Sequence, residues 1–215
     1  MPKIVPIVEG EGEVEAVPKL IHKLLKNTQR WDIGVARPKN SNGCGNLIAP
    51  GGLERFLDLA FREPDCGAVL VLIDADKRSY CDMAADFAAR AVDRGIRFPV
   101  VIVVANREYE AWFLASLDSI SGRSIDGRSG LPAGLSYRGD VEAIVGVKGW
   151  LSRQMPEGRV YKETLDQAPL TGMIDIDLAK AGSRSFRRMC HAVTQAVEAI
   201  DSGSIFVSPP ARRPK

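Results

Sequence analysis

The chain has 215 residues, of which 45% are hydrophobic and 26% are charged, and its formal net charge at pH 7 is +2. This length suits one domain with a full core, the composition excludes global disorder, and so small a net charge points to no particular partner. The four cysteines form no C-x-x-C pair and no apolar run approaches bilayer length, so we expect a cytoplasmic protein without structural zinc.

The first quarter of the sequence alternates between strand and helix patterns. We expect a strand over Lys3–Val8, a helix whose apolar stripe runs from Val14 to Leu25, a strand over Trp31–Ala36 and a helix over Leu53–Phe61. Residues 37–52 are rich in Lys, Asn, Ser, Gly and Pro, a composition that predicts a long loop. Gly10 and Gly12 would let the backbone turn sharply between the first strand and the first helix.

A buried strand is predicted at Val69–Ile73, where five aliphatic residues, three of them β-branched, follow one another. A helix should follow it to about Arg94 and end at Gly95, and the next strand should cover Phe98–Ala105. Another helix begins at Glu110–Ala115. Strands alternating with helices predict an α/β domain with a mainly parallel sheet.

The second half of the chain has a different character. Residues 118–140 predict a surface loop or insertion, Val141–Met155 a helix, Tyr161–Leu178 a loop with a short helix, and Ser185–Ile200 a final amphipathic helix. We therefore expect a catalytic core over residues 1–117, a loop-rich and helical extension packed on the core over 118–207, and a flexible tail over 208–215.

Acidic residues follow three of the predicted strands. Glu9 and Glu13 come after the first strand, Asp74 and Asp76 after the central one, and Glu110 after the next. The carboxyl ends of parallel strands are where ligands bind, and residues two apart in a strand point to the same side. If the three strands are neighbours, their acids should converge on one small volume.

These motifs resemble those of a known group of proteins. An E-G-x-x-E after the first strand, a D-x-D after a later buried strand and a further acid after the next resemble the Toprim superfamily, which includes topoisomerase and primase domains and overcoming-lysogenization-defect nucleases. More narrowly, the motifs look like the bacterial domain-of-unknown-function family 4276. The residues that carry this narrower resemblance are Glu9–Glu13, Asp74–Asp76, Glu110–Ala115, Tyr161 and Ser185–Phe186.

The resemblance implies a Toprim-like Rossmannoid three-layer domain with a C-terminal helical extension. It also implies a magnesium- or manganese-dependent endonuclease acting on DNA or RNA, often encoded beside an AAA- or ABC-type ATPase in settings of phage defence. Glu9 would act as acid/base or metal contact, and Asp74 and Asp76 would hold a divalent cation.

The residue types support this chemistry. Mg²⁺ prefers oxygen ligands, usually a few carboxylates with water and substrate phosphate. Glu9, Asp74 and Asp76 would form one site, and Glu13 and Glu110 are candidates for a second. Without metal, two unit charges about 4 Å apart repel by roughly 4 kcal/mol at an effective dielectric of about 20. Two bound ions roughly 4 Å apart would instead activate water and stabilise the leaving oxygen.

Basic residues lie close to these acids in the sequence. Lys77, Arg78 and Arg107 are expected to offset charge on a transferred phosphoryl group. Other basic residues are candidates for contacts with a nucleic-acid backbone: Arg37, Lys39, Arg184, Arg187 and Arg188.

Three alternatives remain open from the sequence. The acids at Glu13 and Glu110 also suit helix starts, and a D-x-D after a strand can cap the next helix. The absence of a clear match to the late catalytic lysine of the overcoming-lysogenization-defect nucleases favours a non-catalytic adaptor that binds the ATPase partner. A haloacid-dehalogenase-like phosphatase fits less well, because its D-x-D belongs after the first strand, where this chain has Glu9.

Overall fold

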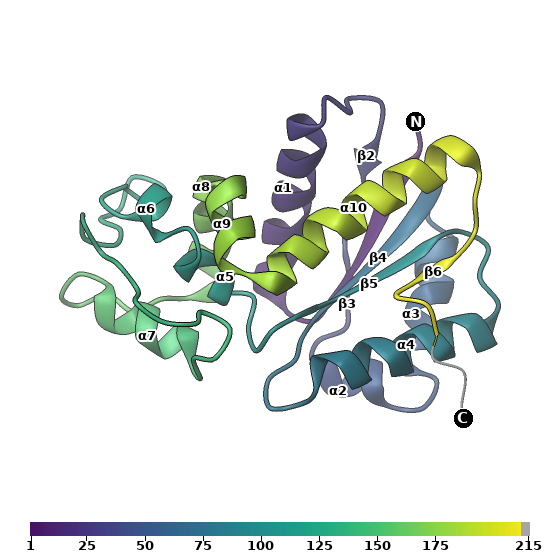
Figure 1. The fold of residues 1–215 in the computed structure, drawn as a ribbon, viewed down its shortest axis with the longest axis horizontal. Helices are drawn as coiled ribbons and strands as arrows, with labels where there is room; N and C mark the ends of the chain where they lie inside the picture. Colours follow the sequence, from purple (N-terminus) through teal and green to yellow (C-terminus); the bar gives the residue numbers. More distant parts are fainter. Residues whose placement is uncertain (212–215) are drawn as a thin grey trace.

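A computed structural model of the chain describes residues 1–211 and shows one parallel β-sheet. Its strands are β1 (Lys3–Val8), β2 (Gly34–Val35), β3 (Lys39–Asn40), β4 (Cys66–Asp74), β5 (Val100–Ala105) and β6 (Val207–Ser208). The strand order is β2-β1-β4-β5-β6, β3 pairs with the end of β1 beyond β2, and every pairing is parallel (Figure 1). The predicted mainly parallel sheet is therefore confirmed.

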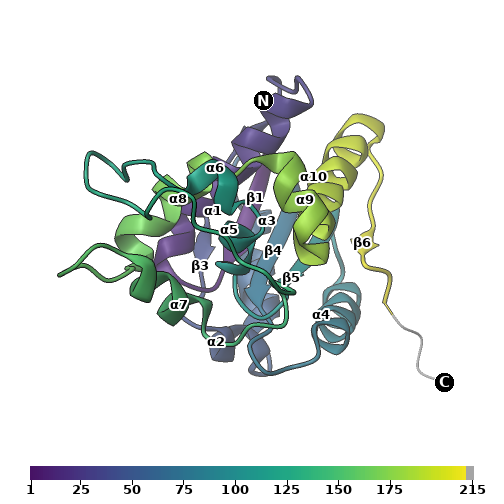
Figure 2. The ribbon, with the colours of Figure 1, turned by 60° about the vertical axis from the view of Figure 1, so that its left-hand side comes forward.

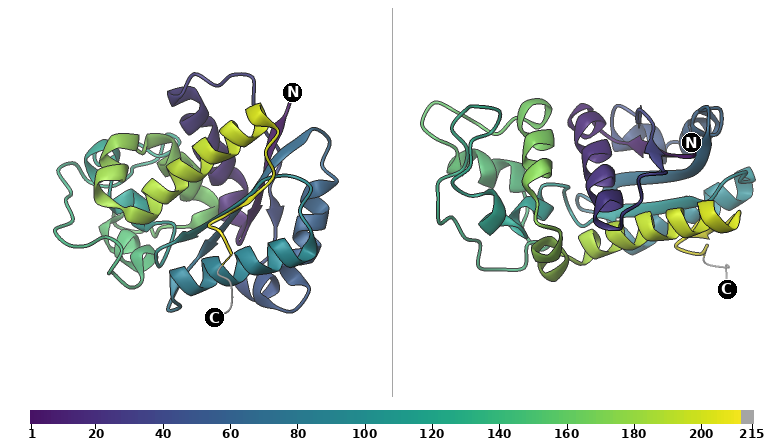
Figure 3. Two further views of the ribbon diagram at one scale, coloured as in Figure 1. Left: turned by 45° about the vertical axis from the view of Figure 1, so that its right-hand side comes forward. Right: turned by 90° about the horizontal axis from the view of Figure 1, so that it is seen from above.

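Helices cover both faces of the sheet, which gives three layers (Figures 1 and 3). One face carries α1 (Glu11–Asn27) and α10 (Arg184–Ser202), and the other carries α2 (Cys44–Ile48), α3 (Gly52–Phe61) and α4 (Tyr80–Arg94). Side chains of β4 alternate between the two cores: Val69, Val71 and Ile73 face α3 and α4, whereas Leu70 and Leu72 face α1 and α10. The strand is buried on both faces, as its continuous aliphatic run predicts.

The remaining helices form a second body beside the sheet, which we call the helical lobe (residues 111–182). It contains α5 (Ala111–Leu114), α6 (Leu117–Ile120), α7 (Val147–Gln154), the π-helical turn η1 (Glu163–Gln167), α8 (Ala168–Met173) and α9 (Ile176–Gly182). Figure 2, in which this lobe comes forward, shows its helices in front of the sheet. The predicted C-terminal helical extension is thus present.

An aromatic cluster joins the lobe to the layered core. The ring of Trp112 lies 4.6 Å from that of Tyr109 and 5.4 Å from that of Phe186, measured between centroids, and the Trp112 indole N–H donates to Ser185 Oγ at 2.9 Å. Phe113 packs edge-on against Tyr109 and Tyr161. Edge-on and tilted ring pairs of this kind stabilise a core beyond their buried area, so the cluster attaches α5 to α10.

Several element boundaries differ from those expected. The second strand has only the two residues of β2, and the loop predicted over residues 37–52 contains β3 and α2, because its backbone pairs with the end of β1. The helix predicted from Val141 starts only at Val147, since its N-cap Gly146 has a left-handed φ of 74°.

The last part of the chain also differs from the expected division. α10, placed in the extension by sequence, packs on β4 and β5 and belongs to the layered core. Ser208, expected in the flexible tail, is buried in β6, where it pairs with Val101. Residues 212–215 of the predicted tail lie outside the described residues. Within residues 1–211, no helix has both the length and the apolar character needed to cross a membrane.

Candidate functional site

Acids from two neighbouring strand ends line one cavity, which we call the acidic cleft. Because β1, β4 and β5 are adjacent and parallel, their carboxyl ends meet at the same edge of the sheet. A cavity of about 330 Å³ lies there, and its wall includes Glu9, Glu13 and Asp74 from the core and Lys148 and Gln167 from the helical lobe. The predicted convergence of Glu9, Glu13 and Asp74 is therefore present.

Glu13 fastens the turn between β1 and α1. Its Oε2 accepts hydrogen bonds from the backbone N–H of Glu9 at 2.7 Å and from that of the N-cap Gly10 at 3.0 Å. The side chain is 5% exposed, and burial, with repulsion from Glu9 and Glu110, raises its pKa to about 8 against the opposing effect of the two N–H groups. Glu13 is thus both a helix cap and a wall of the cleft.

Glu9 and Asp74 connect the ends of the three central strands. Glu9 Oε2 accepts from the Asp74 N–H at 3.3 Å, and Asp74 Oδ1 accepts from the Tyr109 N–H at 2.9 Å. Asp74 is 7% exposed, and burial, followed by repulsion from Glu13 and Glu110, raises its pKa well above the usual range. Both carboxylates are held in fixed orientations by backbone donors.

Glu110 is fully buried behind the cleft, with 0% exposure. Its Oε1 accepts from the Tyr161 hydroxyl at 2.9 Å and from Gln167 Nε2 at 3.2 Å, while Oε2 has no hydrogen-bond partner in the described part of the chain. Burial raises the pKa of Glu110 to about 7, although Lys148, with Nζ 4.0 Å from Oε2, lowers it. Glu110 is therefore a buried acid whose charged form is stabilised by one nearby cation, Lys148.

Lys148 is the functional candidate that sequence reasoning missed. It extends from α7 in the lobe, pairs with Glu163 and lies near Glu110. Burial alone would lower its pKa, but the attraction of Glu110, Glu163 and Asp74 outweighs burial and raises it, so the side chain stays cationic. No motif marks this lysine, because only the packing of the lobe brings it to the acids.

Asp76 is not part of the acidic cleft, which corrects the expectation that it would share a side with Asp74. β4 ends at Asp74, and Asp76 has a left-handed φ of 53°, so the alternation of a strand no longer applies. The exposed Asp76 lines a separate pocket of about 420 Å³ together with Lys77, Arg78 and Arg107. The three predicted phosphate-binding cations therefore accompany Asp76 and not Asp74.

Two of the other predicted nucleic-acid contacts, Lys39 and Arg187, have partners within the protein. Lys39 pairs with Glu63, and Arg187 donates to the carbonyl of Lys180. Arg37 is exposed on the surface. None of the three lines the acidic cleft.

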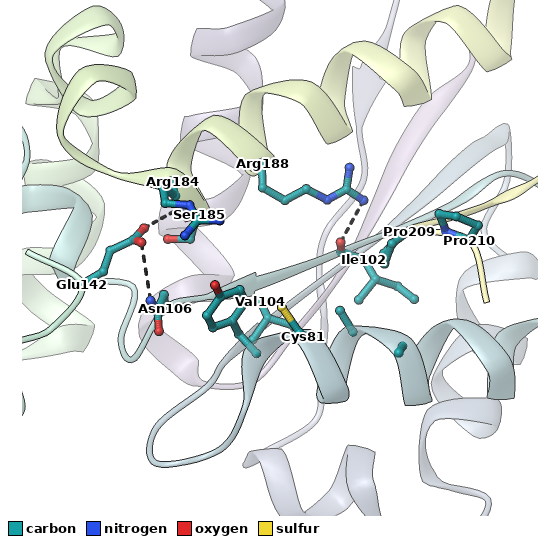
Figure 4. A pocket seen from close by; sticks show the side chains of 13 residues that line it. Cys81, Ile102, Val104, Asn106, Glu142, Arg184, Ser185, Arg188, Pro209 and Pro210 are labelled. Atoms are coloured by element: carbon teal, nitrogen blue, oxygen red, sulfur yellow. Dashed lines mark hydrogen bonds between the residues drawn. The ribbon is translucent and has the colours of Figure 1, made fainter. Parts of the chain in front are cut away.

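Arg184 and Arg188 line an apolar pocket of about 310 Å³ between α4, β5 and α10 (Figure 4). Arg188 donates to the Ile102 carbonyl and to Ser208 Oγ, both at 3.1 Å. These two hydrogen bonds join α10 to β5 and β6. Burial lowers its pKa. Arg188 is thus a structural link and not a free cation.

The carboxylate oxygens of the acidic cleft are the ligand type that a hard cation prefers, but they do not form a complete set of metal ligands. Among residues 1–211, no three His, Cys, Asp or Glu side chains are arranged so that they hold a metal ion. The hydrogen bonds of Glu9 and Asp74 use one carboxylate oxygen each, which leaves the other free within that part of the chain. Mg²⁺ is commonly bound by one or two carboxylates with water and substrate phosphate, and Glu9 with Asp74 fits that pattern.

Comparison with known proteins gives one family match. The chain matches the family described as Domain of unknown function (DUF4276) over residues 8–194. No curated protein matches it. Among solved structures, the C-terminal region of the Burkholderia pseudomallei OLD protein resembles it with a TM-score of 0.44 and 16% identity, covering 93% of this chain and 99% of that chain.

The family match confirms the narrower of the two resemblances drawn from the motifs. It spans most of the sequence and includes every residue on which that resemblance rests, from Glu9 to Phe186. Tyr161 and Ser185, the late motif residues, bond directly to Glu110 and Trp112, so the separated motifs are parts of one structural unit. The chain therefore belongs to the DUF4276 family.

Proposed function

We propose that the protein is a divalent-metal-dependent, Toprim-like nuclease or phosphodiesterase that acts on nucleic acid. The observation that carries this proposal is the meeting of Glu9, Glu13 and Asp74 in one cleft opposite the cation of Lys148. Clustered carboxylates facing a single cation are suited to bind a metal ion and a phosphate together. A partner ATPase and a role in anti-phage defence belong to the proposal through the Toprim and family resemblance.

Each side chain in the cleft has a separate task in this proposal. Glu9 and Asp74 would hold the cation, which would supply a water of lowered pKa and screen phosphate charge. The backbone N–H of Tyr109 orients Asp74, and the Glu13 carboxylate holds the Glu9 backbone in place. Lys148, held between Glu110 and Glu163, faces the substrate phosphate and offsets its charge.

Cleavage assays test the proposal directly. Purified protein is incubated with plasmid DNA, single-stranded DNA and transfer RNA, with magnesium, manganese or a chelator. We expect metal-dependent cutting that falls by about 100-fold or more in Asp74→Asn and Glu9→Gln, the size of effect typical for a positioned catalytic group. Asp76→Asn is the matched control, because Asp76 lines the neighbouring pocket, and it should keep most of the activity. Metal-dependent cutting that survives Asp74→Asn rejects these ligands.

A second candidate function is a non-catalytic adaptor whose acids serve the fold and whose surface binds the ATPase. One observation favours it: Glu9, Glu13 and Asp74 each accept backbone hydrogen bonds, and these bonds join the start of α1, the end of β4 and the segment after β5. A defence assay in cells separates the two functions. Undiminished protection by an Asp74→Ala, Asp76→Ala protein that folds and binds its partner supports the adaptor.

A further inference from the structure

A long groove lies at the opposite end of α1 from the acidic cleft, and we call it the basic groove. It has a volume of about 880 Å³ and runs between the second half of α1, the loop to β2, and the α8–α9 connection. Its charged lining residues are Lys19, Lys23, Lys26 and Arg30, and the lining contains no Asp or Glu. Arg30 is paired with Asp32 and Asp201, which lie outside the lining, so within the described residues the unpaired positive charge of the groove comes from the three lysines of α1.

Trp31 stands beside these cations with 69% of its surface exposed, more than any other large hydrophobic side chain in residues 1–211. The residue before it is anchored, because the Arg30 guanidinium donates to both Asp32 and Asp201 at 2.7–2.8 Å. The loop that carries Trp31 is therefore tied to the end of α10. An exposed indole on this anchored loop offers a flat surface for another ring.

The cations of the groove differ in how they are engaged. Lys23 donates to the Gly172 carbonyl at 2.8 Å, and burial lowers its pKa against the opposing attraction of Asp175. Lys19 and Lys26 are exposed on the same helix and form no ion pair within the described residues. These two side chains are free to meet an anionic ligand, while Lys23 adds a fixed positive charge.

The basic groove and the acidic cleft both lie along helix α1. Helix α1 packs against both η1 and α8, so Glu163 and Gln167 border the cleft at its first turn, and Gly172 borders the groove further along. At about 1.5 Å per residue, Lys19 lies roughly 12 Å and Lys26 roughly 22 Å along the axis from Glu11. The free end of α1, with the loop to β2, is at the top of Figure 1. An extended polymer bound in the groove would point along α1 toward the cleft.

We propose that the basic groove binds single-stranded nucleic acid, with a base stacked on Trp31 and phosphates contacted by Lys19 and Lys26. The inference deepens the proposed function and rests on it for the step from binding to cutting. A flat indole beside exposed cations fits a strand whose bases are free to stack on protein, whereas the bases of a duplex are stacked on one another. The substrate class is thus single-stranded DNA or RNA, or a single-stranded region within a duplex.

Binding without metal tests the stacking contact. Fluorescence anisotropy with a labelled single-stranded oligonucleotide in chelator avoids cutting and does not depend on the acidic cleft. We expect Trp31→Ala to weaken binding at least about five-fold, and Trp31→Phe, which keeps an aromatic ring, to weaken it less. Leu59→Ala is the control, because Leu59 is 43% exposed on α3, on the other face of the sheet.

Salt dependence tests the phosphate contacts. Each phosphate neutralised on a single strand contributes about 0.7 to the slope of log affinity against log salt, so Lys19→Gln with Lys26→Gln should reduce that slope by about 1.4. Arg62→Gln with Arg97→Gln removes two exposed charges from another pocket and should leave the slope unchanged.

Three results overturn the inference: full affinity in a folded Trp31→Ala protein, an unchanged salt slope in the lysine double variant, or equal affinity for duplex and single strand. Circular dichroism melts establish that each variant is folded. The outcomes also separate this inference from the proposed nuclease activity. Trp31-dependent binding by a protein that cuts nothing supports the groove and rejects the nuclease. Cutting that depends on Asp74, together with binding that does not depend on Trp31, supports the nuclease and rejects the groove.

Discussion

Burial is the dominant influence on the acids of the cleft. Glu13, Asp74 and Glu110 all have raised pKa values, and for each of them desolvation is the largest cause. The same groups also repel one another, and the only nearby cation, within the described residues that line the cleft, is Lys148. Ionising these buried acids without a metal lowers the free energy of unfolding. The charge state of the site can therefore be followed by measuring stability.

The stability of the metal-free protein should fall as pH rises from 4.5 toward about 8. In that range the unfolded chain has released the Glu13 proton, whereas the folded protein still holds it, so rising pH favours unfolding. Glu13→Gln should flatten the profile measured by urea unfolding. Glu15→Gln, an exposed neighbour on α1, is the control. A Glu13→Gln profile as steep as that of the parent protein contradicts this assignment.

Lys148→Met should reduce cutting by about 100-fold, the cost typical of removing one donor to a developing oxyanion. The substitution also leaves Glu110 without its nearest cation. Lys148→Arg should recover part of the rate, because it retains the charge. Rates at saturating metal are the measurement, and Lys162→Met, which removes an exposed lysine, is the control. Full activity in Lys148→Met means that the lysine has only a structural role.

At the scale of elements, the contact between α1 and η1 shapes the cleft. The sequence assigns both Gly10 and Gly12 to a sharp turn, but their tasks differ. Gly10 has an ordinary extended conformation with φ −126° as the N-cap of α1. Gly12 lies against η1, where an added Cβ would lie 2.9 Å from Glu163 Cβ and closer still to Gln167 Oε1. Gly12 is therefore required for close packing and not for turning.

Gly12→Ala should destabilise the protein by about 1–3 kcal/mol, the usual cost of forcing an extra methyl group into a packed contact. The same change should displace Gln167 and with it the hydrogen bond to Glu110. Urea unfolding measures the loss, and Gly10→Ala, whose Cβ would meet nothing within 4 Å, is the control. Equal stabilities of the two variants would show that η1 moves to make room for the added methyl group without a loss of unfolding free energy.

At the scale of the whole molecule, the candidate site lies where two bodies meet. Figure 3 shows the two bodies side by side. The layered core supplies Glu9, Glu13 and Asp74, and the helical lobe supplies Lys148 and Gln167. The aromatic cluster around Trp112 fixes one body on the other. A ligand in the cleft therefore contacts both bodies, and its binding stabilises the complete fold.

Magnesium should raise the melting temperature if it binds in the cleft. At a concentration about 100-fold above the Kd, mass action adds about 2.7 kcal/mol, which corresponds to roughly 5–10 °C for a chain of this size. Asp74→Asn should lose this shift, whereas Asp76→Asn should keep it. Differential scanning calorimetry with and without magnesium provides the measurement. Equal shifts in the parent and Asp74→Asn proteins argue against the site.

The sequence by itself determined the layered α/β fold and the acids at its strand ends. The aliphatic run of β4 and the apolar stripe of α1 predict buried elements because hydrophobic periodicity is a local property of the chain. Adjacent parallel strands then necessarily carry Glu9 and Asp74 to one edge. Short elements such as β3 were missed because their pairing depends on distant residues.

Only the tertiary structure decided which side chains share the cleft. Asp76 lies two residues from Asp74 yet faces another pocket, because the strand ends and the backbone becomes left-handed. Lys148 is distant in sequence yet reaches the acids through the packing of the lobe. Sequence patterns report how each element is buried, but the neighbours of a charge depend on where separate elements meet, and that meeting is set by packing across the whole chain.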